Sequence, residues 1–247
     1  MNLSKNNIKL ITSLQQKKYR QKHQLFVAEG VKVVNELLAS SLVVEQLYTT
    51  EESFISSKNV EVILISENEL KKISTLKTPN KVLGIFKIPN KKEVNKGNFI
   101  VALDGINDPG NLGTIIRLCD WFGISELVCS KNTVDCYNQK VVQSTMGSLT
   151  RVQVSYVDLP KFLKSTPLPV YTADMHGDNV YTTPLPQKAV LVMGNEANGI
   201  SLEVADIVKN TVTIPRFGDL QKTESLNVAT ATAILLSEFK RNLIQYD

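Results

Sequence analysis

The chain has 247 residues, 43% of them hydrophobic and 21% charged, a balance that excludes a disordered or fibrous protein. This length suits one large domain or two modest ones. The net charge of +4 says little by itself, but three cysteines without a CxxC pair and only two histidines predict a reduced, cytoplasmic protein without a metal ion. No run approaches the roughly 18 apolar residues of a membrane-spanning helix, so no membrane association is expected.

The first part of the chain alternates helical and strand patterns. Helices are predicted at 3–18, 31–40 and 67–76, and strands at 25–28, 42–49, 60–65 and 82–88. Helices between strands indicate βαβ units, so residues 1–89 are predicted to form a small α/β domain. The polar stretch that follows, 90–97 (NKKEVNKG), is typical of a linker.

Positive charge is concentrated in this first part. Residues 1–97 carry 16 Lys and Arg against 9 Glu and no Asp, a net charge of +7, while residues 98–247 carry 12 against 15, a net charge of −3. A basic module joined to a nearly neutral one suits an enzyme with a polyanionic substrate, because Lys and Arg release counterions from phosphates. A lysine-rich solvated surface is an equally good explanation.

One segment of the basic part, residues 17–30 (KKYRQKHQLFVAEG), combines cations with the aromatic rings of Tyr19 and Phe26. Such a segment is suited to RNA backbone contacts and base stacking. The candidate RNA-binding residues are Lys17, Lys18, Arg20 and Lys22. The alternative is a solvated helix face that leads into a strand.

The second part, residues 98–247, begins again with an apolar strand at 98–106. Further strands are predicted at 126–130, 168–174, 188–194 and 210–215, and helices at 111–122, 138–147, 158–165 and 225–243. This alternation predicts an α/β domain with a mainly parallel sheet and helices on both faces. Ligands of such sheets bind at the carboxyl ends of the strands.

Three loops at predicted strand ends contain unusual combinations of residues. In the first, DGINDPGNLGTIIR (104–117), Pro109 and Gly110 make a tight turn and Asn111 is predicted to cap the helix. Arg117 follows six residues later, so it need not share a helix face with Asn111. A surface position for Arg117 is the alternative.

The second loop, MGNEANGIS (193–201), places a carboxylate and two amides between Gly194 and Gly199. A glycine directly after a strand leaves room for a flat ligand against bare backbone. An ordinary turn, in which Asn195 and Asn198 adopt left-handed conformations, is the alternative.

The third loop lies within 214–241, where Ser225 and Asn227 precede a long helix. A serine at a helix N-terminus is commonly a cap. Small residues on this helix, Ala229, Ala231 and Ala233, predict close packing against another element.

Common nucleotide-binding and hydrolase motifs are absent from the sequence. The chain has no GxxxxGK[ST], GxGxxG or GxSxG segment, which argues against a kinase, a nucleoside triphosphatase, an ordinary Rossmann dehydrogenase and an α/β hydrolase.

In this order the three loops resemble the three sequence motifs of the SpoU/TrmH family of RNA ribose methyltransferases. The first motif resembles NDPGNLGTIIRLCDWFGI (107–124), the second LVMGNEANGIS (191–201), and the third IPRFG (214–218) with ESLNVATATAILLSEF (224–239). The segment RQKHQLFVAEGVKVVNELL (20–38) resembles the opening of the small substrate-binding domain that many members carry.

The resemblance implies an enzyme that transfers a methyl group from S-adenosylmethionine to a ribose 2′-hydroxyl of tRNA or rRNA, without a metal. It also implies a homodimer whose second domain, 98–247, is tied in a C-terminal trefoil knot. The catalytic candidates carried over by position are Asn111, Arg117, Glu196, Ser225 and Asn227. The cofactor-binding candidates are Gly194, Asn195, Ile214 and Leu226, with Thr172 in addition.

The implied chemistry fits these residue types. A sulfonium methyl is already electrophilic, so the enzyme mainly aligns it with the ribose oxygen and eases removal of that oxygen's proton. A guanidinium holds its proton firmly, so Arg117 is expected to grip the adjacent phosphate and orient the hydroxyl. Glu196 is expected to position Arg117 or its loop, and Asn227 with Ser225 to hold the ribose.

Three alternatives are weighed against this function. A related base methyltransferase is opposed by the N-x5-R spacing with SLN, and a non-catalytic RNA-binding protein by the intact Arg117, Glu196 and Asn227. A small-molecule enzyme would not need the basic part, which is expected to capture RNA separately from catalysis. The sequence departs from the family in one place. The stretch DLQKTE (219–224), which includes Lys222, is longer than the corresponding loop expected for the family, and it allows a different target nucleotide.

Overall fold

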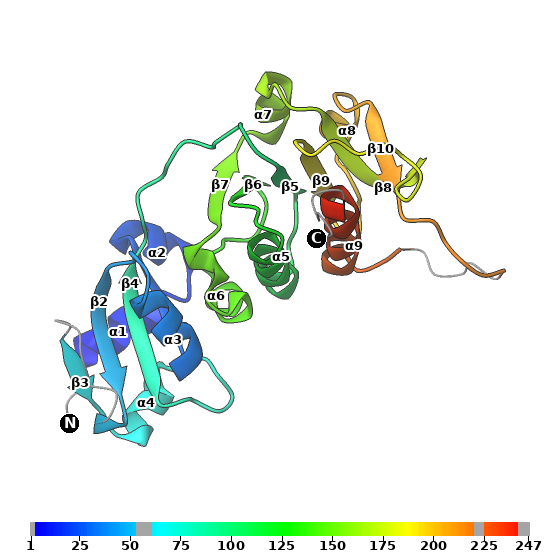
Figure 1. Ribbon diagram of the computed structural model, residues 1–247. Coiled ribbons are helices and arrows are strands. Elements are labelled where there is room, and N and C mark those ends of the chain that lie inside the picture. The colour runs from blue at the N-terminus through cyan, green and yellow to red at the C-terminus, as the bar shows by residue number, and fades with distance from the viewer. Residues whose placement is uncertain (1–2, 53–60, 220–224, 242–247) are drawn as a thin grey trace, which may run out of the picture. The chain divides into compact units, whose positions relative to one another are not determined.

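The computed structural model describes residues 3–52, 61–219 and 225–241 and divides the chain into two compact units (Figure 1). The first unit comprises 1–90 and 135–150, and the second comprises 91–134 and 151–247. Each unit contains one sheet with helices against it, so the predicted α/β class is confirmed. No helix within the described ranges is long and apolar enough to cross a membrane.

The first unit is built around a four-stranded sheet of order β1-β4-β2-β3. The strands are β1 (Leu25–Glu29), β2 (Val44–Thr49), β3 (Val62–Leu64) and β4 (Val82–Lys87). β4 is antiparallel to both β1 and β2, and only β2 and β3 are parallel. The predicted βαβ pattern is therefore wrong for β4, which inserts between two earlier strands. Part of the strand predicted at 60–65 lies outside the described residues.

Helices cover both faces of this sheet. They are α1 (Lys5–Ser13), α2 (Lys17–His23), α3 (Val31–Leu38), α4 (Glu67–Ile73), α6 (Gln139–Thr145) and the short η2 (Ser148–Thr150). One apolar cluster joins α1 and α4 to the sheet, and a second joins α3 and Val142 of α6 to the opposite face. The helix predicted at 3–18 is thus two helices separated by a turn.

The segment Asp135–Thr150 completes the second of these clusters. Phe26 of β1 packs against Tyr137, with ring centroids 4.8 Å apart, and Gln139 Nε2 donates to Glu29 Oε1 at 2.6 Å. Burial raises the pKa of Tyr137 well above its usual range. The sequence placed this segment in the second domain, whereas the structure packs it into the core of the first. Residues 1–89 alone would therefore leave part of their own core uncovered, so they are not a self-contained module.

The second unit contains a six-stranded sheet of order β10-β8-β9-β5-β6-β7, in which every pair of neighbours is parallel. The strands are β5 (Ile100–Asp104), β6 (Glu126–Ser130), β7 (Gln153–Val157), β8 (Val170–Asn179), β9 (Val190–Gly194) and β10 (Asn210–Thr213). β7 is a strand that the sequence did not predict, because Gln153 and Ser155 interrupt its apolar run; all five of its residues are half-buried. Apolar runs such as IVALD are buried on both sides, as expected for a parallel sheet.

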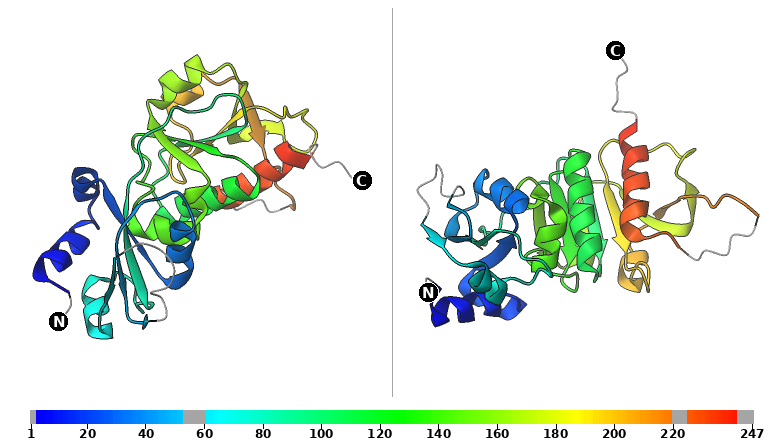
Figure 2. Two further views of the ribbon diagram at one scale, coloured as in Figure 1. Left: turned by 60° about the vertical axis from the view of Figure 1, so that its left-hand side comes forward. Right: turned by 90° about the horizontal axis from the view of Figure 1, so that it is seen from below.

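Helices lie on both faces of this sheet as well. They are α5 (Pro109–Trp121), α7 (Leu159–Ser165), α8 (Leu202–Ala205) and α9 (Val228–Arg241). α7 and α8 pack on the face formed by residues such as Ile100 and Val192. On the other face, α5 and α9 run side by side (Figure 2), and Phe239 of α9 packs against Phe99 with ring centroids 5.1 Å apart.

Candidate active site

The three loops predicted to carry the chemistry all leave the sheet of the second unit at one edge. β5, β9 and β10 are parallel, so the loops that begin at Gly105, Asn195 and Ile214 emerge from the carboxyl ends of these strands. β5 and β9 are direct neighbours, and Asp104 pairs with Gly194 at their last position. The first two loops therefore start side by side.

One side chain from each loop meets the others in a hydrogen-bonded chain. Asn111 Nδ2 donates to Glu196 Oε1 at 2.6 Å, and Asn227 Nδ2 donates to Asn111 Oδ1 at 3.0 Å. The contact with the carboxylate is short because the acceptor is charged. Three of the five catalytic candidates are therefore brought together, with Asn111 in the middle.

The ends of two helices hold these amides in place. The cap of α5 is Asp108, whose Oδ1 accepts from the backbone N–H of Asn111 at 2.8 Å. The prediction that Asn111 is the cap is wrong, because Pro109 occupies the first helical position and moves Asn111 into the first turn. Asn227 Oδ1 accepts from the backbone N–H groups of Ala229 and Thr230, so Asn227 caps α9.

The other two catalytic candidates lie outside this network. Arg117 is exposed on α5 and, among the described residues, makes no hydrogen bond or ion pair with Asn111, Glu196 or Asn227. Six residues along an α-helix correspond to about 9 Å of rise and a different face, which explains the separation. Ser225 is exposed and precedes α9, which begins at Val228 rather than at 225. Lys222 lies outside the described residues.

The cofactor-binding candidates differ in what surrounds them. Ile214 lines a pocket of about 290 Å³ together with Met175, His176, Thr213, Pro215 and Arg216. Leu226 has 49% of its surface exposed. Thr172 is buried and shares a hydrogen bond of 2.9 Å with Thr211 Oγ1.

Gly194 and Asn195 are engaged within their own loop. A Cβ on Gly194 would lie 2.4 Å from the carbonyl carbon of Gly199, so the missing side chain admits the chain's own backbone rather than leaving open space. Asn195 forms a two-way backbone pair with Gly199, and its side-chain amide donates to Gly105 O at 2.6 Å. The sequence expected a ligand surface here, and the structure shows a turn closed on itself.

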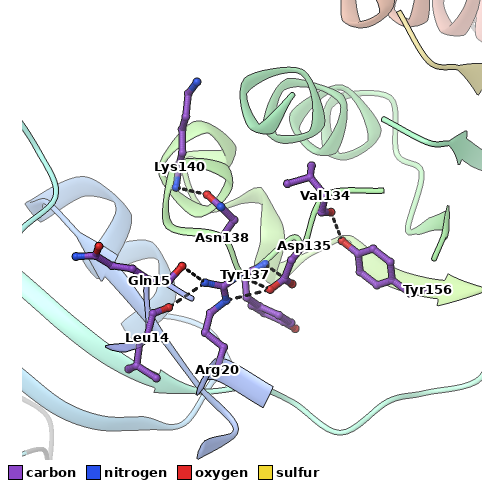
Figure 3. Close-up of polar contacts among 9 residues, drawn as sticks. All are labelled: Leu14, Gln15, Arg20, Val134, Asp135, Tyr137, Asn138, Lys140 and Tyr156. Carbon is purple, nitrogen blue, oxygen red and sulfur yellow. Dashed lines mark hydrogen bonds and ion pairs between the residues drawn. The ribbon is translucent and has the colours of Figure 1, made fainter. Parts of the chain in front are cut away.

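The cationic segment of the first unit contains one residue that is not available to RNA. Arg20 has 2% of its surface exposed, and its Nε and Nη2 donate to Asp135 Oδ2 at 2.9 and 2.6 Å (Figure 3). Its Nη1 donates to the backbone carbonyls of Leu14 and Gln15, two residues in the turn between α1 and α2. The prediction that Arg20 binds RNA is therefore wrong in this structure, since its fork is fully engaged inside the unit.

The neighbours of Arg20 on α2 remain exposed to solvent. They are Lys17, Lys18, Gln21, Lys22 and His23. Lys18 Nζ lies 4.9 Å from the centre of the Tyr19 ring, which in turn stacks with His23. The buried arginine thus fixes a helix whose outer side combines positive charge with an aromatic ring.

Comparison with known proteins finds a family match for each of the two parts of the sequence. Residues 98–237 match the SpoU rRNA Methylase family, and residues 5–84 match the MRM3-like substrate binding domain. The chain is 30% identical over 230 residues to the 23S rRNA (guanosine(2553)-2'-O)-methyltransferase RlmP of Bacillus subtilis, covering 90% of this chain and 91% of that protein.

Two solved structures share the fold over nearly the whole chain. A TrmH-family protein from Porphyromonas gingivalis is 39% identical with a TM-score of 0.88, covering 97% of this chain and 99% of that one. The AdoMet-bound rRNA methyltransferase of Sinorhizobium meliloti is 30% identical with a TM-score of 0.85, covering 98% and 97%. Because the family match spans more than half of the sequence and carries all three loops, the chain is a member of the SpoU rRNA methylase family.

Proposed function

We propose that this protein transfers a methyl group from S-adenosylmethionine to a ribose 2′-hydroxyl of ribosomal RNA. The observation that carries the proposal is the Asn111–Glu196–Asn227 chain, which joins the three loops at one edge of a parallel sheet. The relatives support it, since RlmP is named for 2′-O-methylation of 23S rRNA and the Sinorhizobium meliloti enzyme binds AdoMet.

The pocket at the end of β10 suits the proposed cofactor. Met175, Ile214 and Pro215 give it an apolar wall, and Arg216 adds a cation suited to a carboxylate. Ile214 and the exposed Leu226 would hold the cofactor, which would supply an electrophilic methyl group. No acid is needed to activate that group, so the protein's task is alignment.

Different residues of the protein are proposed to contact the ribose and the phosphate of the RNA. Glu196 fixes the amide of Asn111, and Asn227 fixes its carbonyl, so the orientation of Asn111 is determined from both sides. We infer that this oriented pair of amides, with Ser225, holds the ribose. The exposed Arg117 binds the neighbouring phosphate through two parallel hydrogen bonds, for which a guanidinium is suited.

Transfer of labelled methyl from S-adenosylmethionine to ribosomal RNA from undermodified cells tests this function. The label is expected on a ribose, where it blocks alkaline cleavage of the adjacent phosphodiester. Label recovered on a base would support a base methyltransferase instead. No incorporation into any RNA that the protein binds would support a non-catalytic RNA-binding protein.

We further propose that the outer side of α2 binds the RNA backbone. Replacement of Lys17, Lys18 and Lys22 by alanine is expected to weaken RNA binding and to reduce the steepness of log affinity against log salt by about 2 to 3, since each lost phosphate contact removes about 0.7–0.9. Lys71, Lys72 and Lys77 provide the matched control, because they are also exposed in the first unit and their removal changes the charge equally. Equal losses in both triple variants would contradict a specific role for α2.

The proposed enzyme works in the cytoplasm as a homodimer without a metal ion. Trp121, at the end of α5, has 84% of its surface exposed and is suited to contact with a second copy. Of the small residues on α9, Ala229 is already buried within its own unit, while Ala231 and Ala233 are only half-buried. Light scattering at micromolar concentration tests the dimer, and a stable, active monomer would contradict it.

A further inference from the structure

We propose that Asn195 is a positioning residue for methyl transfer, assisted by Asp104, and not a ligand of the cofactor. Together they hold the loop 195–201 against the end of β5, so that Glu196 meets Asn111. The proposal deepens the proposed function and rests on it.

The side chain of Asn195 is bonded in two directions. Its Nδ2 donates to the carbonyl of Gly105 at 2.6 Å, across to the neighbouring loop. Its Oδ1 accepts from the backbone N–H groups of Ala197 and Asn198, at 2.9 and 3.1 Å, within its own loop. One amide therefore folds the turn that presents Glu196 and ties this turn to the start of the first loop.

The backbone of Asn195 is also engaged. Its N–H donates to Gly199 O, and Gly199 N–H donates back to Asn195 O, both at 2.8 Å. An amide oxygen has two lone pairs, and both of those on Oδ1 are used. A cofactor that bound Oδ1 or the Asn195 backbone would have to break the turn, which is why a positioning role fits better than a ligand role.

Asp104 makes a second tie between the same two loops. Asp104 has 7% of its surface exposed, and its Oδ2 accepts from the backbone N–H of Ser201 at 2.8 Å. Asn195 and Ser201 bracket the loop, so it is attached to the β5 end near both of its ends. A buried carboxylate without such a donor would be costly, so this contact is strongly favoured in the folded state.

Gly105, whose carbonyl accepts the hydrogen bond from Asn195, is itself held in place. Gly105 has a φ of +72°, a conformation that favours glycine, and its N–H donates to Ser130 Oγ at 2.8 Å. Its carbonyl receives Asn195, so both polar groups of this peptide position are fixed. The first and second loops are thus joined at their bases by Gly105 and Asn195 and at their tips by Asn111 and Glu196.

The proposal predicts that loss of the Asn195 side chain lowers kcat and leaves the binding of RNA and cofactor nearly unchanged. In Asn195→Ala the tie at the base is lost, and Glu196 shifts relative to Asn111. A misplacement of about 1 Å costs on the order of 10²-fold in rate, so kcat is expected to fall by about that factor. The KM for RNA and the Kd for S-adenosylmethionine should change by less than about threefold, because the polar groups of Asn195 are engaged within the protein and the proposal gives it no contact with either ligand.

Asn198→Ala is the matched control, since it removes the other asparagine side chain of the same loop, which is exposed, and leaves the backbone N–H of residue 198 in place. Its kcat is expected to stay within about twofold of the wild-type value. Asn195→Asp provides a second variant that keeps an acceptor for the turn but loses the donor to Gly105. It is expected to lose kcat as Asn195→Ala does, with the turn preserved.

Asp104 supplies the rescue test. Asp104→Asn retains an oxygen that accepts from Ser201 N–H, whereas Asp104→Ala does not, so the asparagine variant should keep most of the kcat that the alanine variant loses. Thermal melts establish that each variant is folded at the assay temperature.

Two results would overturn the proposal. One is a rise in the Kd for S-adenosylmethionine that matches the fall in kcat of Asn195→Ala, because that would make Asn195 a cofactor ligand. The other is a wild-type kcat in folded Asn195→Ala or Asn195→Asp. A wild-type protein that methylates no RNA would instead refute the proposed function, so the two failures are distinguishable.

Discussion

Replacing Arg117 with alanine is expected to abolish methyl transfer and to leave the affinity for S-adenosylmethionine within a few-fold of the wild-type value. Arg117 lies on α5, exposed and outside the hydrogen-bonded chain formed by Asn111, Glu196 and Asn227. Its proposed partner is the phosphate beside the target ribose, which is present only when RNA is bound. The loss therefore belongs to the step that orients the hydroxyl, and cofactor binding is unaffected.

The geometry of the guanidinium matters as much as its charge. Arg117→Lys keeps the charge but replaces a planar fork by a point charge, so it is expected to recover little activity. Single-turnover methyl transfer with saturating RNA, together with calorimetric titration of the cofactor, separates the two quantities. A parallel fall in turnover and cofactor affinity would contradict the assigned role.

Arg151→Ala controls for the loss of a surface arginine in the same unit. Arg151 is exposed and pairs with Asp120 of α5 at 2.9 Å, so its removal disturbs the same helix about one turn beyond Arg117. We expect this variant to retain activity. If it were as inactive as Arg117→Ala, the effect would lie in the placement of α5 rather than in a contact with RNA.

Strand positions in the second unit were predictable because they depend on local patterns. Strands such as β5 and β9 are continuous apolar runs, and a parallel sheet buries such runs on both faces. Parallel strands also bring their carboxyl ends to one edge, so the proximity of the three loops followed from topology. The half-polar β7 lacks that signal and was missed.

Contacts between the loops were not predictable, because the sequence does not show which asparagine side chain of one loop lies against which group of the next. The sequence shows Asn195, Asn198 and Asn111 as equivalent amides near strand ends, yet only Asn195 is tied to Gly105. The cap of α5 could have been predicted correctly. Proline favours the first position of a helix, so Pro109 indicates that the preceding residue, Asp108, is the cap rather than Asn111.

The packing of Asp135–Thr150 into the first unit could not be predicted for a similar reason. Arg20 and Asp135 are separated by 115 positions, and nothing in a local pattern pairs them. A cationic helix looks the same whether all of its charges are solvated or one is buried against a distant carboxylate. In the structure Arg20 is buried against Asp135, and Val142 and Tyr137 pack against residues of the first part of the chain. Deletion of residues 1–89 would therefore expose Val142 and Tyr137 as well as remove the lysines proposed to bind RNA, so it does not test RNA binding alone.

Gly147→Ala in the full chain is therefore expected to destabilise the first unit strongly. Gly147 has a φ of +98°, and an added Cβ would lie 2.5 Å from Cβ of Glu36 on α3. Because that atom is attached directly to the α3 backbone, the helix itself must shift. The left-handed φ costs about 1–2 kcal/mol and the overlap about 1–3 kcal/mol more, so the free energy of unfolding should fall by about 3 kcal/mol.

Gly123→Ala isolates the conformational part of that cost. Gly123 has a φ of +66°, and no atom lies within 4 Å of the position of an added Cβ, so only the left-handed backbone is penalised. Urea unfolding of both variants measures the difference, which should be about 2 kcal/mol in the direction of a less stable Gly147→Ala. Equal losses would mean that α3 does not rest on Gly147. In that case Asp135–Thr150 would contribute little to the stability of the core on which α2, the proposed RNA-binding helix, rests.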